Sequence, residues 1–315
     1  MVELDPGTRA RGKTRRDPPK RKRKKKRRFS LVNFILVLAF LAGAGLVSYP
    51  TISDWWNSAQ AYKTISNYSS QVQGMSDEEK DRIFEAAEAY NTKRPNGTDF
   101  SLDDAGMEEY MSLLDVTGTG LMGHVDIPSI GVSLPVYHTV EEDVLQKAVG
   151  HVPGSSLPVG GERTHAALSG HRGLPSAKLF TDLNRLAEGD IFTLTVLDRV
   201  LTYQVDQIRI VLPEETKDLA IQPGRDFLTL ITCTPYGVNS HRLLVRGVRI
   251  ETMQEAVIIP RDASRVPGYA AAPFMGAAIG AFAAVLFLIW RLISGRRRPK
   301  NGMLDDIRKN GIGRK

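Results

Sequence analysis

The pattern of apolar and polar residues divides the chain into three kinds of segment. Two uncharged, apolar runs of membrane-crossing length lie near the ends, at 29–49 and 270–290. Between them, the stretch from Asp54 to Lys93 carries apolar residues at helical spacing, and from about Leu121 the pattern changes to short alternating runs. The chain therefore predicts a membrane-spanning helix near each end, a helical segment after the first, and a β-rich domain before the second.

The β-rich segment has the two-residue alternation of strands with one buried face. Residues 191–211 alternate on both sides of a turn at 197–199, which predicts a hairpin. The runs 227–233 and 242–250 predict two more strands, whereas a leucine stripe over 176–189 predicts a short helix that ends at a glycine. Many short strands with one or two brief helices indicate a closed or nearly closed β-barrel of about 130 residues, which can bury a core without disulfides.

The predicted fold is mainly β, a barrel that follows a helical region and is flanked by two transmembrane helices. In chain order, its parts are a basic tail (1–28), a transmembrane helix or signal anchor (29–49), an extracytoplasmic helical region (50–93), a lid-like loop (94–120), the β-barrel (121–252), a linker (253–269), a transmembrane helix (270–290) and a second basic tail (291–315). A cleaved signal peptide is the alternative for the first span, although its long, charged leader favours an uncleaved anchor.

Charge is segregated along the chain. Residues 1–28 carry a net charge of +11 and residues 291–315 a net charge of +7, whereas the whole chain carries +7, so residues 29–290 carry −11. Basic runs can also bind nucleic acid. Each run here adjoins an apolar span, however, which indicates charge that flanks a membrane and no nucleic-acid partner. The positive-inside rule then places both termini in the cytoplasm and the barrel on the outer side of the cell membrane.

The chain contains a single cysteine, Cys233, in the strand-like run TLITCTPYGVNSHRLLVRG (229–247). One thiol makes no internal disulfide and builds no zinc site, so neither a metal nor another cofactor is expected. Two interpretations are left: a small buried residue, which is the commoner case, or a nucleophile. A nucleophile needs a neighbouring base or cation, because a thiol with a pKa near ~8.5 is mostly protonated at neutral pH.

Histidines and one arginine supply candidates for that neighbour. The six histidines are His124, His138, His151, His165, His171 and His241. His171 stands at the end of a short apolar run, before a Gly/Pro loop, although the residues alone leave His165 and His241 open as competitors. Arg242 opens the strand after Cys233, and antiparallel pairing would set the two side by side. There a guanidinium can donate to a carbonyl oxygen that becomes negative, although a surface salt bridge is the alternative.

Four stretches make the sequence similar to the sortases, cysteine transpeptidases of Gram-positive bacteria, and within them to class C, the pilin-polymerising group. They are HVPGSSLPVGG (151–161), THAALSGHRGLPSAKLFTDL (164–183), TLITCTPYGVNSHRLLVRG (229–247) and the apolar span near the carboxyl end. The resemblance implies that Cys233 is the nucleophile, His171 the general acid and base, and Arg242 the group that stabilises the oxyanion or substrate. It also implies that Thr232 helps to shape the substrate groove.

Class C sortases carry a lid before the barrel, with an Asp-Pro-aromatic motif that covers the active site. The corresponding loop of this chain has Asp99 and Phe100 in the sequence TDF, without the proline. We expect the aspartate to reach the Cys233–Arg242 pair and the ring to fill the groove. The plug should be less rigid than in the family, because the fixed φ of a proline is missing.

The resemblance implies a membrane-anchored enzyme that cleaves an LPxTG-like sorting signal through a thioester and joins one pilin to a lysine amine of another. Its partners would be pilin subunits with C-terminal sorting signals and an acceptor lysine. A housekeeping sortase, which attaches surface proteins to cell-wall peptidoglycan, is the alternative enzyme, and a non-catalytic membrane-anchored binding barrel is the alternative without chemistry. A papain-like protease fits less well, because its cysteine precedes its histidine in the chain.

Overall fold

The computed structural model describes residues 31–252 together with residues 280 and 284. The helices in this part of the chain are α1 (Leu31–Gln73), α2 (Asp77–Lys93), α3 (Asp104–Ser112) and α4 (Glu142–Leu145). The strands are β1 (Leu121–Ile127), β2 (Val132–His138), β3 (Val149–His151), β4 (Thr164–Ser169), β5 (Ile191–Val196), β6 (Arg199–Val211), β7 (Asp226–Thr234) and β8 (His241–Ile250).

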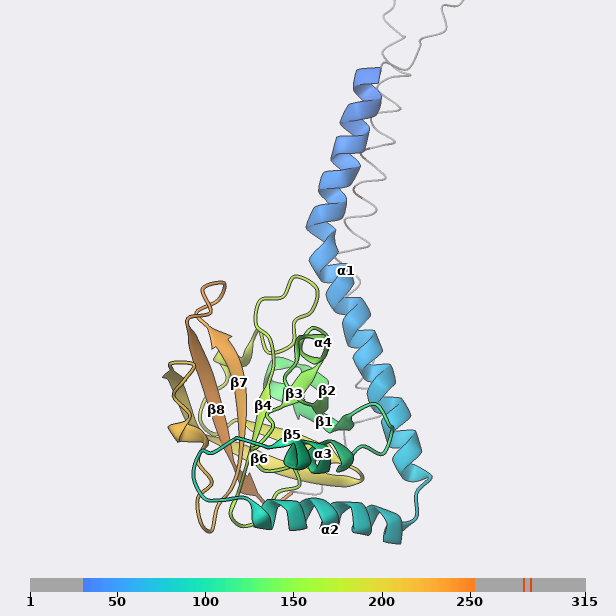
Figure 1. The fold of residues 1–315 in the computed structure, drawn as a ribbon. Helices are drawn as coiled ribbons and strands as arrows, with labels where there is room; N and C mark the ends of the chain where they lie inside the picture. Colours follow the sequence, from blue (N-terminus) through green and yellow to red (C-terminus); the bar gives the residue numbers. More distant parts are fainter. Residues whose placement is uncertain (1–30, 253–279, 281–283, 285–315) are drawn as a thin grey trace, which may run out of the picture. The chain divides into compact units, whose positions relative to one another are not determined.

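These strands close into a barrel in the order β1-β2-β3-β4-β7-β8-β6-β5 (Figure 1). Most neighbours are antiparallel, whereas β2 with β3 and β4 with β7 form parallel pairs. A parallel pair needs a long connection, and between β4 and β7 the chain forms the β5–β6 hairpin. The closed barrel and the hairpin over 191–211 that the sequence predicts are confirmed.

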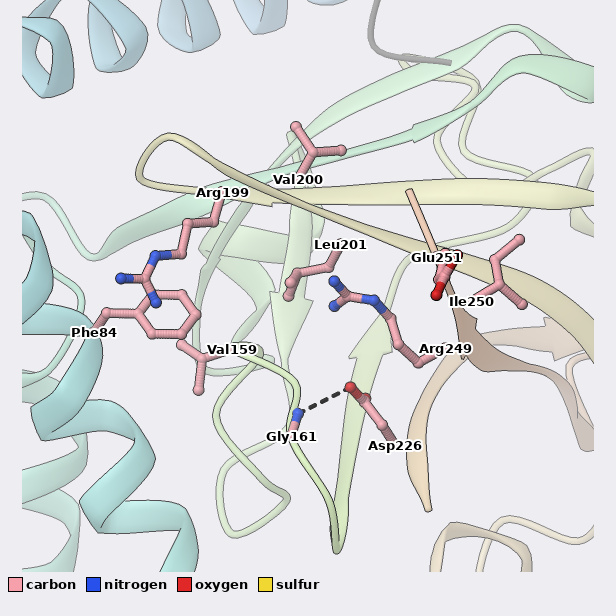
Figure 2. Close-up of a pocket in the computed structure, with 10 residues that line it drawn as sticks. All are labelled: Phe84, Val159, Gly161, Arg199, Val200, Leu201, Asp226, Arg249, Ile250 and Glu251. Carbon is pink, nitrogen blue, oxygen red and sulfur yellow. Dashed lines mark hydrogen bonds between the residues drawn. The ribbon is translucent and has the colours of Figure 1, made fainter. Parts of the chain in front are cut away.

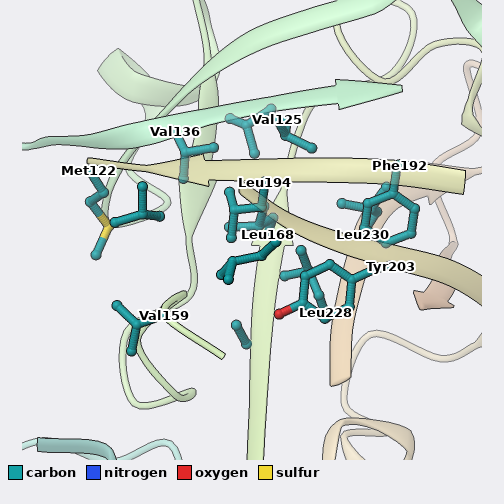
Figure 3. Packing of buried hydrophobic residues seen from close by; sticks show 14 of the residues in the cluster. Met122, Val125, Val136, Val159, Leu168, Phe192, Leu194, Tyr203, Leu228 and Leu230 are labelled. Atoms are coloured by element: carbon teal, nitrogen blue, oxygen red, sulfur yellow. The ribbon is translucent and has the colours of Figure 1, made fainter. Parts of the chain in front are cut away.

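Alternate residues of the strands fill the interior of the barrel (Figure 3). On β7, Leu228 and Leu230 are fully buried and belong to the same cluster as Phe192 of β5 and Tyr203 of β6. The two aromatic rings stack with their centroids 5.7 Å apart. Gly247 of β8 leaves room for them, because a Cβ at this position would lie 2.6 Å from the ring of Phe192. A larger residue at position 247 would therefore displace an aromatic ring from the core.

The prediction of a helix over 176–189 is wrong. This segment forms turns with one short 3-10 helix at Leu183–Arg185. The leucines of the stripe are nevertheless buried, so their spacing marked burial and not helical conformation. The reason is a longer-range hydrogen bond. In an α-helix the amide of Phe180 would donate to the carbonyl four residues earlier, but here it donates to the carbonyl of His171 at 3.1 Å and closes a loop.

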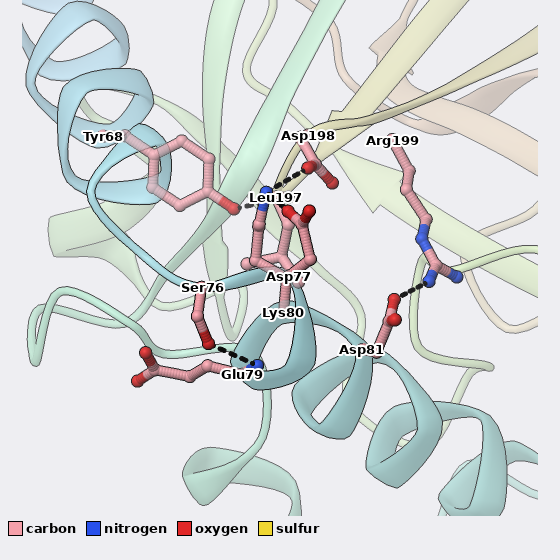
Figure 4. Close-up of polar contacts among 9 residues, drawn as sticks. All are labelled: Tyr68, Ser76, Asp77, Glu79, Lys80, Asp81, Leu197, Asp198 and Arg199. Atoms are coloured by element: carbon pink, nitrogen blue, oxygen red, sulfur yellow. Dashed lines mark hydrogen bonds and ion pairs between the residues drawn. The ribbon is translucent and has the colours of Figure 1, made fainter.

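Helix α2 lies against the turn of the β5–β6 hairpin (Figure 4). Ser76 caps its first turn by accepting a hydrogen bond from a backbone amide. Lys80 Nζ lies 2.6 Å from Asp198 Oδ2, and Arg199 Nη2 lies 2.6 Å from Asp81 Oδ1. These two pairs tie the helix to the turn.

Helix α1 contacts the barrel through residues that follow its apolar part. The Tyr68 hydroxyl accepts a hydrogen bond from the Leu197 amide at 2.8 Å and donates one to the Met122 carbonyl at 2.9 Å. Burial raises the pKa of Tyr68 to about 12, so the hydroxyl keeps its proton as a donor. This buried anchor fixes the end of α1 to the barrel between β1 and the β5–β6 turn.

Among the residues that the structure describes, α1 is the one helix long and apolar enough to cross a membrane. The predicted second span (270–290) lies outside the described residues except at positions 280 and 284. The linker (253–269) and the tails (1–28 and 291–315) also lie outside them. The predicted lid-like loop (94–120) is described, and it contains helix α3.

Candidate active site

Strands β7 and β8 set two groups of the predicted site opposite each other. The strands pair antiparallel, and their register places Cys233 against Arg242, which is the pairing that the sequence predicts. Residues directly opposite in such a pair extend their side chains to the same face, with Cβ atoms ~4.5–5.5 Å apart. Both residues are partly exposed. The thiol and the guanidinium therefore share one solvent-accessible face of the sheet.

Arg242 is held at the start of β8 by the turn that precedes it. Its Nη1 donates to the carbonyl oxygens of Asn239 and His241, each at 3.2 Å. Five N–H groups belong to a guanidinium, so these two bonds leave donors for a further acceptor. The turn thus fixes the orientation of the arginine without using all of its hydrogen-bonding capacity.

His171 follows β4, and the parallel register of β4 with β7 directs it toward Cys233. The ladder ends with Ser169 against Ile231. Two further residues along each strand set His171 against Cys233. In a parallel pair, residues at the same level point to the same face, so a continuation of this register would direct the imidazole to the face of the thiol.

Contacts on both sides of His171 continue this register beyond the ladder. The amide of Gly170 donates to the carbonyl of Ile231 at 3.0 Å. On the other side, Arg172 Nη1 donates to Thr234 Oγ1 at 3.0 Å. The residues that flank His171 therefore contact the residues on both sides of Cys233. The register therefore places His171, Cys233 and Arg242 at the same end of three adjacent strands, β4, β7 and β8.

Thr232, which the resemblance implies helps to shape the substrate groove, has its side chain on the inner face of the barrel. Its side chain is buried, and its Oγ1 donates to the carbonyl of Gly170 at 2.7 Å. This bond holds the backbone one residue before His171. Thr232 thus acts on the position of the histidine from inside the barrel.

The structure separates His171 from its two competitors. His165 is buried, and its Nε2 lies 2.7 Å from Thr229 Oγ1, while its Nδ1 lies 3.0 Å from a backbone carbonyl. Burial lowers the pKa of His165 to about 4, so it is a neutral structural residue. His241 pairs with Thr234, one position away from Cys233, so its side chain leaves the sheet on the opposite face.

Glu142 is a polar neighbour of His171 that sequence reasoning missed. It begins helix α4, and its Oε2 lies 3.4 Å from His171 Nε2. The side chain of His171 is 27% exposed and that of Glu142 is 69% exposed. The pKa of Glu142 is lowered mainly by a hydrogen bond from the Gln146 amide and next by His171. A single exposed acid in a short helix carries no signal in the sequence, because only the fold brings it to the histidine.

The outer face beside Cys233 has an apolar floor, which we call the outer-face cluster. Its buried members are Ala167, Leu219, Ile231 and Leu244, and Phe100, Val152 and Val211 pack against them. Ile231 and Leu244 are the residues next to Cys233 and Arg242 on the same face, since each lies two positions along its strand. The thiol therefore stands at the end of an apolar surface, as an extended peptide with an apolar side chain would require.

The segment 94–101 crosses this surface and brings Phe100 onto the cluster. Arg94 Nη2 donates to the carbonyls of Asp99 and Gly154, at 2.9 and 2.7 Å. Gly97 forms an isolated bridge with Ile221. The backbone of Phe100 lies so close to Gly154 that a Cβ on the glycine would overlap it. The segment is thus held to the barrel by bonds that Gly97 and Arg94 make before the aromatic ring, and by the close approach of the Phe100 backbone to Gly154.

Asp99 does not make the contact that we expect from the family motif. Its Oδ1 accepts hydrogen bonds from the amide and hydroxyl of Ser101, at 3.0 and 2.6 Å. These bonds lower the pKa of Asp99, so the carboxylate stays ionised within its own turn. The ring of Phe100 lies on the apolar floor, whereas the aspartate is exposed beside it.

Two cavities differ in their distance from the thiol. A cavity of about 650 Å³ lies between Gly97 and Thr98 on one side and the β6–β7 connection on the other, with Val211, the β-strand neighbour of Arg242, in its wall. A cavity of about 610 Å³ surrounds Asp226 at the start of β7 (Figure 2). Seven residues of extended strand, roughly 23 Å, separate Asp226 from Cys233. The second cavity is therefore too far away to hold a bond that the thiol attacks.

Comparisons with known proteins agree with this geometry. A sortase-domain family profile matches residues 125–250. Sortase D from Bacillus subtilis is 30% identical over 165 residues, which cover 51% of this chain and 79% of that protein. The structure of sortase C1 from Streptococcus agalactiae is 46% identical with a TM-score of 0.59, and the match covers 61% of this chain and 100% of that one. Sortase C from Streptococcus pneumoniae, whose structure was described for its insights into catalysis and pilin substrate specificity, is 44% identical with a TM-score of 0.56, over 60% of this chain and 97% of that one. The chain therefore belongs to the sortase family of cysteine transpeptidases, and class C sortases are among its structural neighbours.

Proposed function

We propose that this chain is a membrane-anchored class C sortase that joins pilin subunits covalently. The observation that carries the proposal is the strand register that sets Cys233 against Arg242 and that, continued two residues past Ser169, would bring His171 to the same face. In this proposal Cys233 is the nucleophile, His171 the general acid and base, and Arg242 the donor to the oxyanion.

The first half-reaction forms a thioester. The sorting signal, an LPxTG-like pentapeptide, lies extended on the outer-face cluster, and the Cys233 thiolate attacks the threonine carbonyl carbon. The carbonyl oxygen becomes negative and accepts hydrogen bonds from Arg242. The carbon–nitrogen bond then breaks, and the glycine nitrogen leaves as an amine with the proton that the His171 imidazolium donates.

The second half-reaction transfers the acyl group to a lysine. The ε-amine of an acceptor pilin attacks the thioester carbon and gives its proton to the neutral His171. The carbon–sulfur bond breaks, an isopeptide bond forms, and the thiolate is regenerated. Two acyl transfers replace one difficult amide exchange, which is the advantage of covalent catalysis. The amine must compete with water, so a covered groove favours transfer over hydrolysis.

Four observations support class C and membrane attachment. Segment 94–101 lies on the outer-face cluster, as a lid would, and class C sortases are among the structural neighbours. Helix α1 has the length and apolarity to cross a membrane. With basic residues before the span, the barrel lies outside the cytoplasm. Anchoring raises the encounter rate with pilins that are themselves held in the membrane.

A competition between two amines tests this function against the housekeeping alternative. The full chain, in detergent micelles, is given an LPxTG-type peptide together with a lysine-bearing pilin domain and a cell-wall peptide amine at equal concentration. We expect the isopeptide product on the pilin lysine to dominate. Transfer to the cell-wall amine alone would instead assign the housekeeping role.

A further inference from the structure

The first turns of α1 beyond its apolar part contact the loop that follows His171. Asp54 Oδ1 accepts a hydrogen bond from the amide of Lys178 at 2.6 Å. Asn57 Nδ2 donates to the carbonyl of Ser176 at 2.7 Å. Asp54 and Asn57 lie three residues apart and so on the same side of the helix. Together they hold the backbone of the loop at two points two residues apart.

This loop is in turn closed onto His171 itself. The amide of Phe180, two residues after Lys178, donates to the carbonyl of His171 at 3.1 Å. The ring of Phe180 is buried against Gly170, where a Cβ would lie 2.8 Å from the ring. A displacement of Lys178 would therefore move the residue that fixes the backbone of His171. The path from α1 to the histidine contains only a few residues: a hydrogen bond at Lys178, two residues of chain, and a hydrogen bond from Phe180 to His171.

The helix turn that makes these contacts lies at the end of the apolar run. Asp54 is the first charged residue after Arg28, five residues beyond Tyr49. The next two residues are Trp55, 46% exposed, and Trp56, 59% exposed. Tryptophan is enriched where a membrane meets water, so these residues suit the interface. The same helical turn thus carries two aromatic interface residues and the two polar contacts to the loop.

We propose that Asp54 and Asn57 are positioning residues for His171, through which the membrane anchor sets the geometry of the active site. The inference rests on the proposed role of His171 and extends it to residues of α1. Asp54 and Asn57 do not touch substrate. They restrict the 172–179 loop, so that the imidazole is held where it reaches both the thiol and the leaving amine.

The test uses the full chain in lipid nanodiscs and compares alanine variants on one helix. Asp54→Ala and Asn57→Ala remove the contacts while keeping helix propensity. Asp54→Asn is the conservative variant, because its amide oxygen still accepts from Lys178. Gln71→Ala is the matched control: its side chain also bonds a loop carbonyl, that of Val116 at 2.6 Å, but in a loop that does not follow His171. The readouts are kcat and KM separately, the pH profile of kcat/KM, and the melting temperature.

We expect Asp54→Ala combined with Asn57→Ala to lower kcat about 10-fold, since misplacement of a catalytic group by about 1 Å costs up to 10²-fold. KM and the melting temperature should change little, and the limb of the pH profile that His171→Ala removes should shift. Asp54→Asn should restore most of kcat, and Gln71→Ala should match the unchanged enzyme.

An unchanged kcat and pH profile in the double variant would overturn the inference, as would an equal loss in Gln71→Ala. If His171→Ala itself kept full activity, the proposed function would fail instead, so the two failures are distinguishable.

Discussion

The two faces of β7 use alternate residues of one strand for different purposes. The inner face, with Leu228 and Leu230, is closed by the barrel core. The outer face, with Ile231 and Cys233, is covered in the described part of the chain by residues from other segments, among them Phe100 before the barrel and Leu219 after β6. The inner face therefore sets stability, whereas the outer face sets access to the thiol. A single strand can thus be rigid on one side and reactive on the other.

The largest effect should come from an arginine on the outer face of β8. Arg242→Lys should lower kcat/KM by about 100- to 1,000-fold, because an ammonium does not reproduce the guanidinium fork at the oxyanion. Arg246→Lys is the matched control on the same face, where Arg246 pairs with Asp206 at 3.0 and 2.8 Å. It should keep most of the activity. Steady-state kinetics with a sorting peptide measure both, and equal losses would remove the special role of position 242.

Neighbouring residues of β7 should separate stability from catalysis. Leu230→Ala empties a fully buried site and should lower the free energy of unfolding by about 2–5 kcal/mol. Ile231→Ala should cost near the lower end of that range, since its surroundings at the surface can relax, but should raise KM for the peptide. Denaturant unfolding and steady-state kinetics measure the two effects. If Leu230→Ala alone raised KM, the division between the faces would be wrong.

Two buried histidines near the same strands, His151 and His165, should make the stability of the fold depend on pH. Burial lowers the pKa of His165 to about 4 and that of His151 to about 3. An unfolded chain binds their protons below its ordinary histidine pKa of ~6.5, whereas the folded chain does not. Their contribution to stability is therefore present above about pH 6.5 and is lost toward pH 4, by up to roughly 1.4 kcal/mol per pH unit for each. Urea unfolding between pH 7 and 5 measures this slope, and His165→Gln should make it shallower; an unchanged slope would contradict the assignment.

The smallest effect should come from the ring that covers the outer face. Phe100→Ala should increase the rate at which a small thiol reagent modifies Cys233 several-fold, because the ring packs on the cluster beside it. Asp99→Asn should change this rate little, since Asp99 bonds within its own turn. Mass spectrometry of the modified protein measures both rates. A larger effect of Asp99→Asn would mean that the aspartate, and not the ring, restrains the lid.

Much of the barrel and of the candidate site followed from local patterns. Two-residue alternation is sufficient to define β5 and β6, because each has one buried face. Cys233 and Arg242 are separated by a turn-rich connection, and the antiparallel pairing expected of the flanking strands sets these residues opposite each other, as the structure confirms. The order of histidine, cysteine and arginine along the chain then indicated the sortase family, and with it the proposed roles of these residues.

The remaining features depend on contacts between residues far apart in the chain. The segment 176–189 has helical spacing but is closed by the bond from Phe180 to His171. The contact between Asp54 and Lys178 spans 124 positions, and that between Glu142 and His171 spans 29. No periodicity or motif reports such pairs. Thr232 was expected at the groove because its motif lies there, but alternation along β7 turns its side chain inward.

The most direct test of the account is the chemical state of Cys233 during the reaction. Full-length protein mixed with an LPxTG-type peptide and no amine should show, by intact-mass and peptide mass spectrometry, an acyl adduct on Cys233 that hydroxylamine removes. Cys233→Ala should show no adduct while its melting temperature stays within a few degrees. Cleavage of the peptide at an undiminished rate by Cys233→Ala, or an adduct on another residue, would contradict a site built around this thiol.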